Sequence, residues 1–251
     1  MIKTQWDERS RNWTRSGPPL QPNQEVIDYL LSQVNVDADI LLLGVTTQIY
    51  QAFNYITAVD RELVMIEKVW LGDTETKHAV LDNWLTVELP DNNFDAIFGD
   101  GSINMLVNSK EVLTLVENCK EWLTPTGQFM CRVFTRPDQP ITRERLLAEA
   151  KNPTVGWTAF RRLVPMVLAD EQGAFVPWAK VYTFFNELFP DRSQLAFTAE
   201  EISRMDAYKD VTTSTWFPTR KEILDLIPDA EFVDVGTYDI ADTCPFIIVK
   251  K

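Results

Sequence analysis

Three short segments of the chain carry residue types that can hold a small ligand, and each one follows an apolar run. They are Gly44-Val45-Thr46-Thr47, the single carboxylate Asp60, and Asp82-Asn83-Trp84. If the apolar runs are parallel strands of one sheet, the three segments meet at one edge, because ligands bind at the carboxyl ends of such strands. The order and spacing therefore predict one cleft that all three segments build.

The first segment is a weak signal when it is taken alone. Glycine at position 44 permits a sharp turn and the close approach of a ligand. Thr46 or Thr47 can begin the next helix, whose free N–H groups would face a carboxylate or phosphate. A strand followed by a glycine turn recurs in many α/β proteins, so this segment gains meaning only from the other two.

The other two segments also have a structural alternative. A carboxylate at Asp60 can accept hydrogen bonds from both hydroxyls of a ribose, and it can equally cap a helix over 62–69. The 82–84 segment can bond an adenine edge and pack its indole on the ring, or it can be an ordinary turn with a core tryptophan. Together the three segments are more specific than any one of them.

The elements that must position these segments alternate between strands and helices. The pattern predicts strands over 39–44, 55–59, 78–81, 94–98, 128–134, 231–238 and 245–250, and helices over 47–53, 62–69 and 108–123. Asn23 is expected to cap an earlier helix. This alternation predicts an α/β fold with a doubly wound, mostly parallel sheet.

The pattern divides the chain into four parts. Residues 1–22 form an N-terminal arm or lid, which carries Trp6 and Trp13 and whose prolines are expected to hold the backbone extended. Residues 23–140 form the α/β core, 141–215 a helical insertion after the fifth strand, and 216–251 a last helix and strands that complete the sheet. The stretch 141–210 is expected to be wholly helical. Its aromatic part, 157–189, either roofs an active site or forms a core of its own.

These features resemble the class I S-adenosylmethionine-dependent methyltransferases over roughly residues 24–136. The resemblance rests on the 44–47 loop, Asp60, the 82–84 corner, the run Phe94-Asp-Ala-Ile-Phe-Gly-Asp-Gly and the segment 123–129. It implies a Rossmann-like fold whose last strand is antiparallel, with S-adenosylmethionine as cofactor and a small-molecule acceptor. The loop has one glycine where the family usually has two or three, and the GxGxxG fingerprint of nicotinamide-binding domains is absent.

The resemblance also implies a set of cofactor-binding residues. Asp60 and Arg61 would hold the ribose, Met65 and Trp70 would pack near adenine, and the 82–84 corner would flank the base. The full set is Trp13, Gly44, Val45, Thr46, Thr47, Asp60, Arg61, Met65, Asp82, Asn83, Trp84, Gly99, Asp100, Gly101 and Ser102. Trp13 belongs to it only if the arm lies over the cofactor, and simple packing of the arm is the alternative.

Asp100 is the candidate catalytic residue, because it ends the fourth strand beside the expected methyl position. It could orient an amine or deprotonate a hydroxyl, or it could only bind the amino group of the cofactor. His78 is expected to be structural, since it starts the third strand at the opposite end of the sheet. Arg132 and Arg136 are expected to be a strand-face charge and a loop charge, with an acidic substrate as the alternative.

Composition narrows the classes of partner. The 251 residues carry a net charge of −13, and the basic clusters, Arg143/Arg145 and Arg161/Arg162, are short. The negative electrostatic field of such a protein disfavours binding to nucleic acid and to anionic membranes. Three scattered cysteines and one histidine predict reduced core thiols and no metal site. With no apolar run long enough for a bilayer and no signal-peptide pattern, a cytoplasmic location is the expectation.

The leading hypothesis from the sequence is a small-molecule methyltransferase. A cofactor-binding scaffold without activity is one alternative, favoured by the single-glycine loop. An aminopropyl-type transferase on the same fold is another. The sequence leaves the acceptor and the oligomeric state open.

Overall fold

One seven-stranded sheet forms the centre of the protein, of which a computed structural model describes residues 5–251. The strands are β1 (Asp39–Leu43), β2 (Tyr55–Asp60), β3 (Lys77–Leu81), β4 (Phe94–Asp100), β5 (Leu123–Arg132), β8 (Glu231–Val233) and β9 (Phe246–Lys250). They lie in the order β3-β2-β1-β4-β5-β9-β8, and the first five are parallel. β9 runs antiparallel to both of its neighbours. The predicted doubly wound, mostly parallel sheet with an antiparallel last strand is confirmed.

Helices cover both faces of this sheet, which explains why its strands are continuous apolar runs. Successive side chains of a strand point to opposite faces: Ile40 and Leu42 pack with one cluster of buried side chains, and Leu41 and Leu43 with another. The first cluster includes side chains of α2 (Gln24–Gln33), α3 (Thr47–Ala52) and α4 (Leu63–Val69). The second includes side chains of α5 (Ser109–Trp122) and α10 (Arg220–Leu226). Asn23 caps α2 as predicted, with its side chain accepting from the Val26 N–H.

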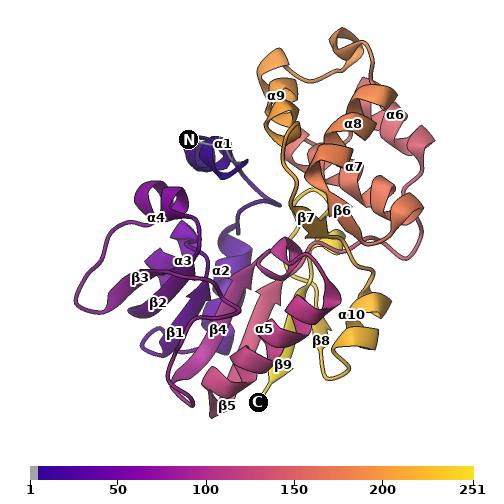
Figure 1. Ribbon diagram of the computed structural model, residues 1–251. Helices are drawn as coiled ribbons and strands as arrows, with labels where there is room; N and C mark the ends of the chain where they lie inside the picture. The colour runs from indigo at the N-terminus through magenta and orange to yellow at the C-terminus, as the bar shows by residue number, and fades with distance from the viewer. Residues whose placement is uncertain (1–4) are drawn as a thin grey trace.

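The helical insertion, residues 141–215, packs around a third apolar core beside the carboxyl edge of the sheet (Figure 1). It contains α6 (Arg143–Lys151), α7 (Trp157–Gln172), α8 (Trp178–Leu188) and α9 (Ala199–Ser203), followed by the 3₁₀ helix η4 (Arg204–Tyr208). The expectation that 141–210 is wholly helical is wrong at β6 (Phe175–Pro177), which pairs antiparallel with β7 (Ser214–Trp216). Residues 214–216 lie far along the chain, so local pattern could not reveal this pairing.

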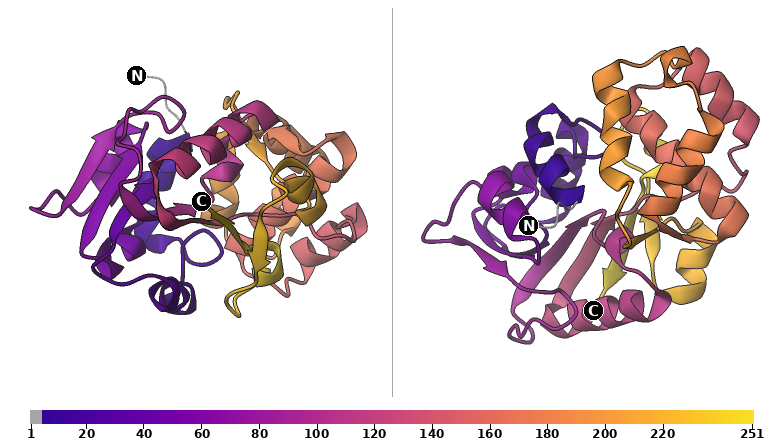
Figure 2. Two further views of the ribbon diagram at one scale, coloured as in Figure 1. Left: turned by 90° about the horizontal axis from the view of Figure 1, so that it is seen from below. Right: turned by 45° about the horizontal axis from the view of Figure 1, so that its top comes forward.

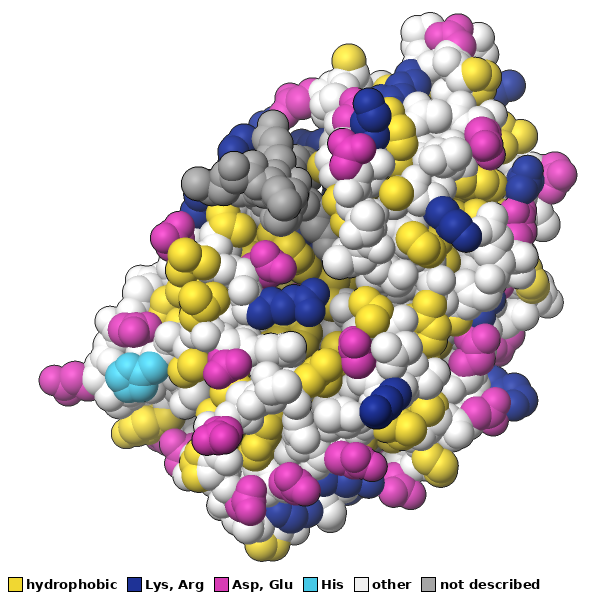
Figure 3. All heavy atoms as spheres, viewed as in Figure 1, with side chains coloured by type: hydrophobic (Ala, Val, Ile, Leu, Met, Phe, Trp, Pro, Cys, Tyr) yellow, Lys and Arg dark blue, Asp and Glu magenta, His cyan; other side chains and the backbone are white. Residues whose placement is uncertain are grey.

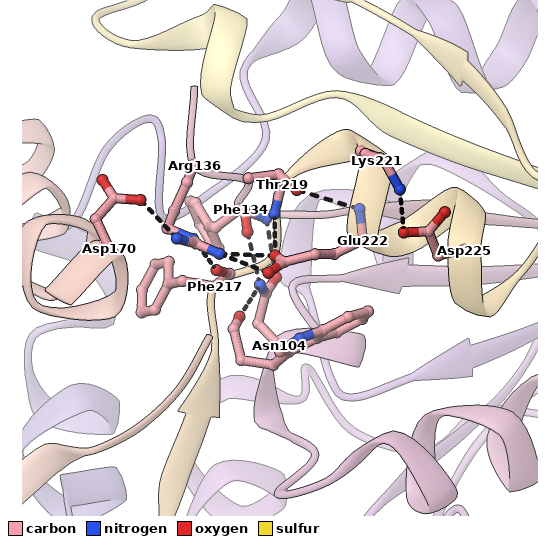
Figure 4. Close-up of polar contacts among 10 residues, drawn as sticks. Asn104, Phe134, Arg136, Asp170, Phe217, Thr219, Lys221, Glu222 and Asp225 are labelled. Carbon is pink, nitrogen blue, oxygen red and sulfur yellow. Dashed lines mark hydrogen bonds and ion pairs between the residues drawn. The ribbon is translucent and has the colours of Figure 1, made fainter. Parts of the chain in front are cut away.

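Two buried polar side chains join the sheet to the insertion (Figure 4). Arg136, just beyond β5, donates to Asp170 of α7 at 2.5 Å, to Glu222 of α10 at 2.7 Å and to the Phe217 carbonyl at 2.7 Å. The expected loop charge is therefore a buried clamp, because three acceptors from separate elements surround it.

Asn104 makes the second junction from η2 (Ile103–Met105), and its side chain is fully buried. Its amide donates to the carbonyls of Phe134 at 2.9 Å and Trp216 at 2.6 Å, and its oxygen accepts from the Phe134 N–H at 2.9 Å. One side chain thus fixes the backbone that leaves β5 to the small β6-β7 sheet.

The N-terminal arm lies between the sheet and the insertion in all the views (Figures 1 and 2). It forms a helix, α1 (Gln5–Arg11), and a 3₁₀ turn, η1 (Trp13–Arg15). At its proline run the Pro18–Pro19 peptide is cis and the Leu20 N–H bonds the Gly17 carbonyl, so the backbone turns there and the expected extended backbone is wrong.

The penultimate strand is shorter than the predicted 231–238. β8 ends at Val233, and Gly236 takes φ +98°. The Thr237 N–H and hydroxyl then bond the Glu25 carboxylate of α2 at 2.8 and 3.0 Å, so they do not join the strand ladder. A contact with the first helix of the core therefore ends the strand.

Candidate functional site

The three segments singled out in the sequence converge on the end of β2. The Val59 carbonyl accepts from the Gly44 N–H at 2.9 Å and from the Trp84 indole at 2.6 Å. The Asp82 N–H bonds the Asp60 carbonyl at 3.2 Å. The glycine turn, the carboxylate and the tryptophan corner are therefore tied to two consecutive residues of one strand.

A cleft opens at this point along the carboxyl edge of the sheet. The space between its walls, including a part open to solvent, is about 800 Å³. We call it the main cleft. Its lining residues are Trp6, Arg9, Trp13, Leu20, Leu43, Gly44, Val45, Thr46, Asp60, Arg61, Glu62, Met65, Asn83, Trp84, Asp100, Gly101, Ser102, Met105, Leu106 and Phe134.

Most of the predicted cofactor-binding residues are in this lining, and three are not. Thr47 lies behind it, where its hydroxyl donates to the Val69 carbonyl at 3.0 Å and accepts from the Trp13 indole at 3.1 Å. Asp82 is exposed and its carboxylate accepts from the Asn83 N–H. Gly99 is packed against Ser102 and Cys131, where a Cβ would collide with both side chains.

Trp70 also lies outside the lining. Its indole donates to Asp73 at 2.9 Å and its ring packs edge-on against Tyr50. By contrast, Trp13 lines the cleft while its indole holds Thr47. The contact of Gln21 with Gln48, at 2.8 Å, is a second attachment of the arm to α3. The arm is therefore a fixed wall of the main cleft in this structure.

Gly44 and Asp60 face each other across the cleft floor. Gly44 has φ +108°, a conformation that side chains disfavour, and a Cβ there would lie 3.9 Å from Asp60 Oδ2. The other oxygen, Oδ1, accepts from the Glu62 N–H at 2.9 Å. Asp60 is 8% exposed, and this burial raises its pKa from 3.8 to about 6. The floor thus holds a desolvated carboxylate with one oxygen turned toward the glycine turn.

Asp100 ends β4 in an ion pair that the sequence did not reveal. Its Oδ1 accepts a hydrogen bond from Arg132 Nε at 2.6 Å and lies 2.6 Å from a terminal guanidinium nitrogen in an ion-pair contact, and Arg132 also donates to the Tyr238 hydroxyl at 3.0 Å. Arg132 is 2% exposed, so the expected strand-face charge is an interior one. Burial disfavours its charge, but Asp100 outweighs that effect and the pKa of Arg132 is raised. Burial also raises the pKa of Tyr238 to about 12.

Phe134 forms the end of the main cleft beyond Asp100. A Cβ on Gly101, which has φ +73°, would lie 3.1 Å from the Phe134 ring. Asn104 holds the backbone of Phe134 on both its N–H and its carbonyl. The sequence analysis did not identify Phe134 and Arg9 as lining residues. Phe134 follows β5 and Arg9 belongs to α1, and these two elements lie far apart in the chain. A phenylalanine at the last position of the predicted strand over 128–134 was the available signal.

The remaining polar groups lie away from this cleft or are buried. His78 is exposed near the start of β3, at the amino end of the sheet, and Cys119, Cys131 and Cys244 are buried free thiols as predicted. Within residues 5–251, no three His, Cys, Asp or Glu side chains gather as a metal site, and no helix has the length and apolar character to cross a bilayer. Figure 3 shows acidic side chains scattered over the face it presents.

Comparison with known proteins places the fold. No protein-family model and no curated protein matches this sequence. Among solved structures, a SAM-dependent methyltransferase from Methanosarcina mazei matches 92% of this chain and 99% of its own, with 13% identity and a TM-score of 0.51. A Burkholderia thailandensis 1,6-didemethyltoxoflavin-N1-methyltransferase, solved with its substrate and S-adenosylhomocysteine, matches 97% of this chain and 83% of its own, with 11% identity and a TM-score of 0.52.

A third neighbour carries a different kind of name. It is a Rhodobacter sphaeroides protein provisionally named a Zn-dependent alcohol dehydrogenase, and it matches 100% of both chains with 12% identity and a TM-score of 0.60. Identities this low show the fold alone. The fold is the Rossmann-like fold of the class I S-adenosylmethionine-dependent methyltransferases, and the reaction has to be argued from the main cleft.

Proposed function

We propose that this protein binds S-adenosylmethionine in the main cleft and transfers its methyl group to a small-molecule acceptor. One observation carries the proposal: the Gly44 turn and the Trp84 corner both bond the Val59 carbonyl, and the buried carboxylate of Asp60 lies next to them. This arrangement presents a carboxylate, an aromatic ring and an open glycine turn to one ligand.

The residues present fit the nucleoside part of that cofactor. Asp60 Oδ2 makes no hydrogen bond within residues 5–251, and the space beside Gly44 that a Cβ would fill adjoins it. A ribose hydroxyl would supply the donor that this oxygen lacks, and burial strengthens such a bond. Met65, Asn83 and Trp84 line the part of the cleft assigned to adenine.

The other end of the cleft holds the residues assigned to the amino acid part. Val45, Thr46 and Ser102 line it, together with Asp100 and Gly101. Because Arg132 takes both of its contacts on Asp100 Oδ1, the other carboxylate oxygen is left for the amino group of the cofactor. We therefore assign Asp100 to binding and orientation.

Methyl transfer requires mainly that the protein align the cofactor and the acceptor. The cofactor supplies a methyl group on a cationic sulfonium, and its leaving thioether is neutral. The side chains of the chain hold the two reactants in line and exclude water. Trp13 and the arm wall the cleft on one side, and Phe134 walls it at the insertion. On this proposal residues 1–22 are a lid and residues 141–215 cover the acceptor.

Calorimetric titration with S-adenosylhomocysteine at pH 8 tests the proposal. The wild type should bind it, and Asp60→Asn should bind at least about tenfold more weakly, because an amide lacks the charge that a ribose hydroxyl prefers. Asp95→Asn is the matched control: Asp95 is exposed at the other end of β4 and accepts from the Asp39 N–H. Absence of binding heat in the wild type would refute the proposal.

Two further measurements separate the alternatives. Tighter binding of decarboxylated S-adenosylmethionine than of S-adenosylmethionine would indicate an aminopropyl-type transferase. Binding of S-adenosylhomocysteine with no methyl transfer to any member of a broad acceptor panel would indicate a scaffold.

A further inference from the structure

A second hollow lies next to the main cleft, between the arm and the helical insertion. It encloses about 390 Å³, part of it open to solvent, and α1, α7, α8 and η4 contribute to its walls. Its lining includes Arg9, Arg161, Trp178, Arg204 and Tyr208. We call it the arginine hollow. In a chain with net charge −13, such a concentration of arginine is unexpected.

Buried donors of Arg161 and Trp178, which line this hollow, and of Arg162, which lies next to Trp178, lack acceptors. Arg161, Arg162 and Trp178 are 8%, 2% and 2% exposed. Both Arg Nε atoms, one terminal nitrogen of Arg162 and the Trp178 indole nitrogen are sealed from solvent with no hydrogen-bond partner among the described protein atoms. All four of these atoms are donors. Buried polar groups normally have partners, so the hollow is complementary to a group that only accepts.

The charges of Arg161 and Arg162 are also uncompensated. Within residues 5–251 neither one forms an ion pair, whereas Glu200 pairs with Arg204 at 3.9 Å and also with Arg15. Burial, together with the nearby charges of Arg9 and Arg161, lowers the pKa of Arg162 to about 9. A buried cation among cations is unfavourable unless an anion joins it.

Aromatic rings account for only part of this environment. The Arg162 guanidinium lies 4.5 Å from the Phe134 ring centre and 5.9 Å from that of Trp178, which stacks on Tyr208 at 4.3 Å. Ring faces attract a guanidinium, but they do not satisfy its sealed N–H groups. The rings therefore provide a flat apolar wall beside the donors.

The hollow adjoins the end of the main cleft where the methyl group is expected. Phe134 lines the main cleft beside Gly101, and its ring also contacts the Arg162 guanidinium. Arg9 lines both hollows. A molecule with an oxyanion at one end and a nucleophile at the other could therefore reach both places.

We propose that the arginine hollow binds the carboxylate or phosphate of an anionic acceptor, whose apolar body lies against Trp178 and Tyr208. The assignment to the acceptor rests on the proposed methyl transfer, but the binding of an oxyanion rests on the arginines alone. Arg161 supplies a charge and an N–H donor, Trp178 supplies a second donor, and Arg162 next to Trp178 adds to the positive charge behind the wall of the hollow.

Calorimetric titration with benzoate and with inorganic phosphate, at pH 7.5 and constant ionic strength, tests this proposal. The wild type should bind at least one of them, and benzamide, which lacks the charge, should bind at least tenfold more weakly than benzoate. Arg161→Gln should weaken the binding at least tenfold. Arg145→Gln, at an exposed arginine of α6, should leave it unchanged.

Arg162→Met gives a second, independent readout. It replaces the uncompensated cation with an apolar side chain of similar length, so the unliganded protein should melt at a higher temperature, and the oxyanion should no longer raise that temperature. Failure of the wild type to bind either oxyanion, equal binding of benzoate and benzamide, or an Arg161→Gln variant that binds like Arg145→Gln would overturn the proposal.

The two proposals fail separately. Asp60→Asn should lose S-adenosylhomocysteine and keep the oxyanion, while Arg161→Gln should do the reverse. Oxyanion binding by a protein that does not bind S-adenosylhomocysteine would leave the arginine hollow intact and remove only its assignment to a methyl acceptor.

Discussion

Asp60→Asn should make the unliganded protein more stable at neutral pH while it removes the proposed ribose contact. The carboxylate is 8% exposed, and its burial raises its pKa from 3.8 to about 6. Above pH 6 the folded protein must therefore hold a charged group in a place that favours the neutral one. Asparagine has nearly the same shape, keeps an oxygen for the Glu62 N–H and carries no charge.

The size of the effect follows from the pKa difference. A rise of about 2 units, from 3.8 to about 6, corresponds to about 3 kcal/mol at 1.36 kcal/mol per unit. Because the folded pKa is the higher one, the wild type loses this stability as the pH rises from about 4 through about 6. The advantage of the variant should thus be about 3 kcal/mol at pH 8 and about 1.6 kcal/mol at pH 5. The hydrogen bond from the Glu62 N–H opposes this rise in pKa, the Glu62 charge adds to it, and the charges of Arg61 and Arg9 oppose it.

Urea unfolding at pH 5 and pH 8 measures this difference, with Asp95→Asn as the control. The S-adenosylhomocysteine affinity of the wild type should also fall about fivefold from pH 6 to pH 5, since the ionised fraction of Asp60, whose pKa is about 6, falls by that factor. A variant that is less stable than the wild type at pH 8, or whose advantage is equal at both pH values, would show that Asp60 is not a strained, desolvated carboxylate.

Three other substitutions test the walls of the cleft. Gly44→Ala places a Cβ at φ +108° beside Asp60, so it should cost about 1–3 kcal/mol of stability and weaken S-adenosylhomocysteine binding; unchanged binding would contradict the open glycine turn. Asn104→Ala leaves both backbone groups of Phe134 unpaired, so it should lower the free energy of unfolding by at least about 3 kcal/mol. Urea unfolding measures this loss, and a loss below about 1 kcal/mol would contradict the prediction. Arg132→Met leaves the buried carboxylate of Asp100 without its cationic partner, so it should lower the free energy of unfolding by about 3–5 kcal/mol. A variant as stable as the wild type in urea would contradict this prediction.

The parts of this fold that follow from local pattern could be predicted from the sequence. β1 is a continuous apolar run because helices cover both faces of the sheet. Pattern predicted a strand at each parallel position, but β3 has no fully buried side chain, and β5 begins at Leu123, earlier than the predicted strand over 128–134. The convergence of Gly44, Asp60 and Trp84 followed from a general property of parallel sheets. It needed no knowledge of how the chain outside the sheet folds.

The parts that depend on distant contacts could not be predicted. The pairing of β6 with β7, the clamp at Arg136 and the Asp100 ion pair each join segments far apart in the chain. The Arg161/Arg162 doublet was visible, but only its position in the middle of α7, where nearly every side chain is buried, shows that these charges are interior.

Arg9 of the arm lines both the main cleft and the arginine hollow. By thermodynamic linkage, a ligand that contacts Arg9 in one hollow changes the binding free energy of a ligand in the other hollow, and the change is the same in both directions. On the two proposals above, occupation of the main cleft would therefore change the affinity of the arginine hollow, and occupation of the hollow would change the affinity of the cleft by the same factor.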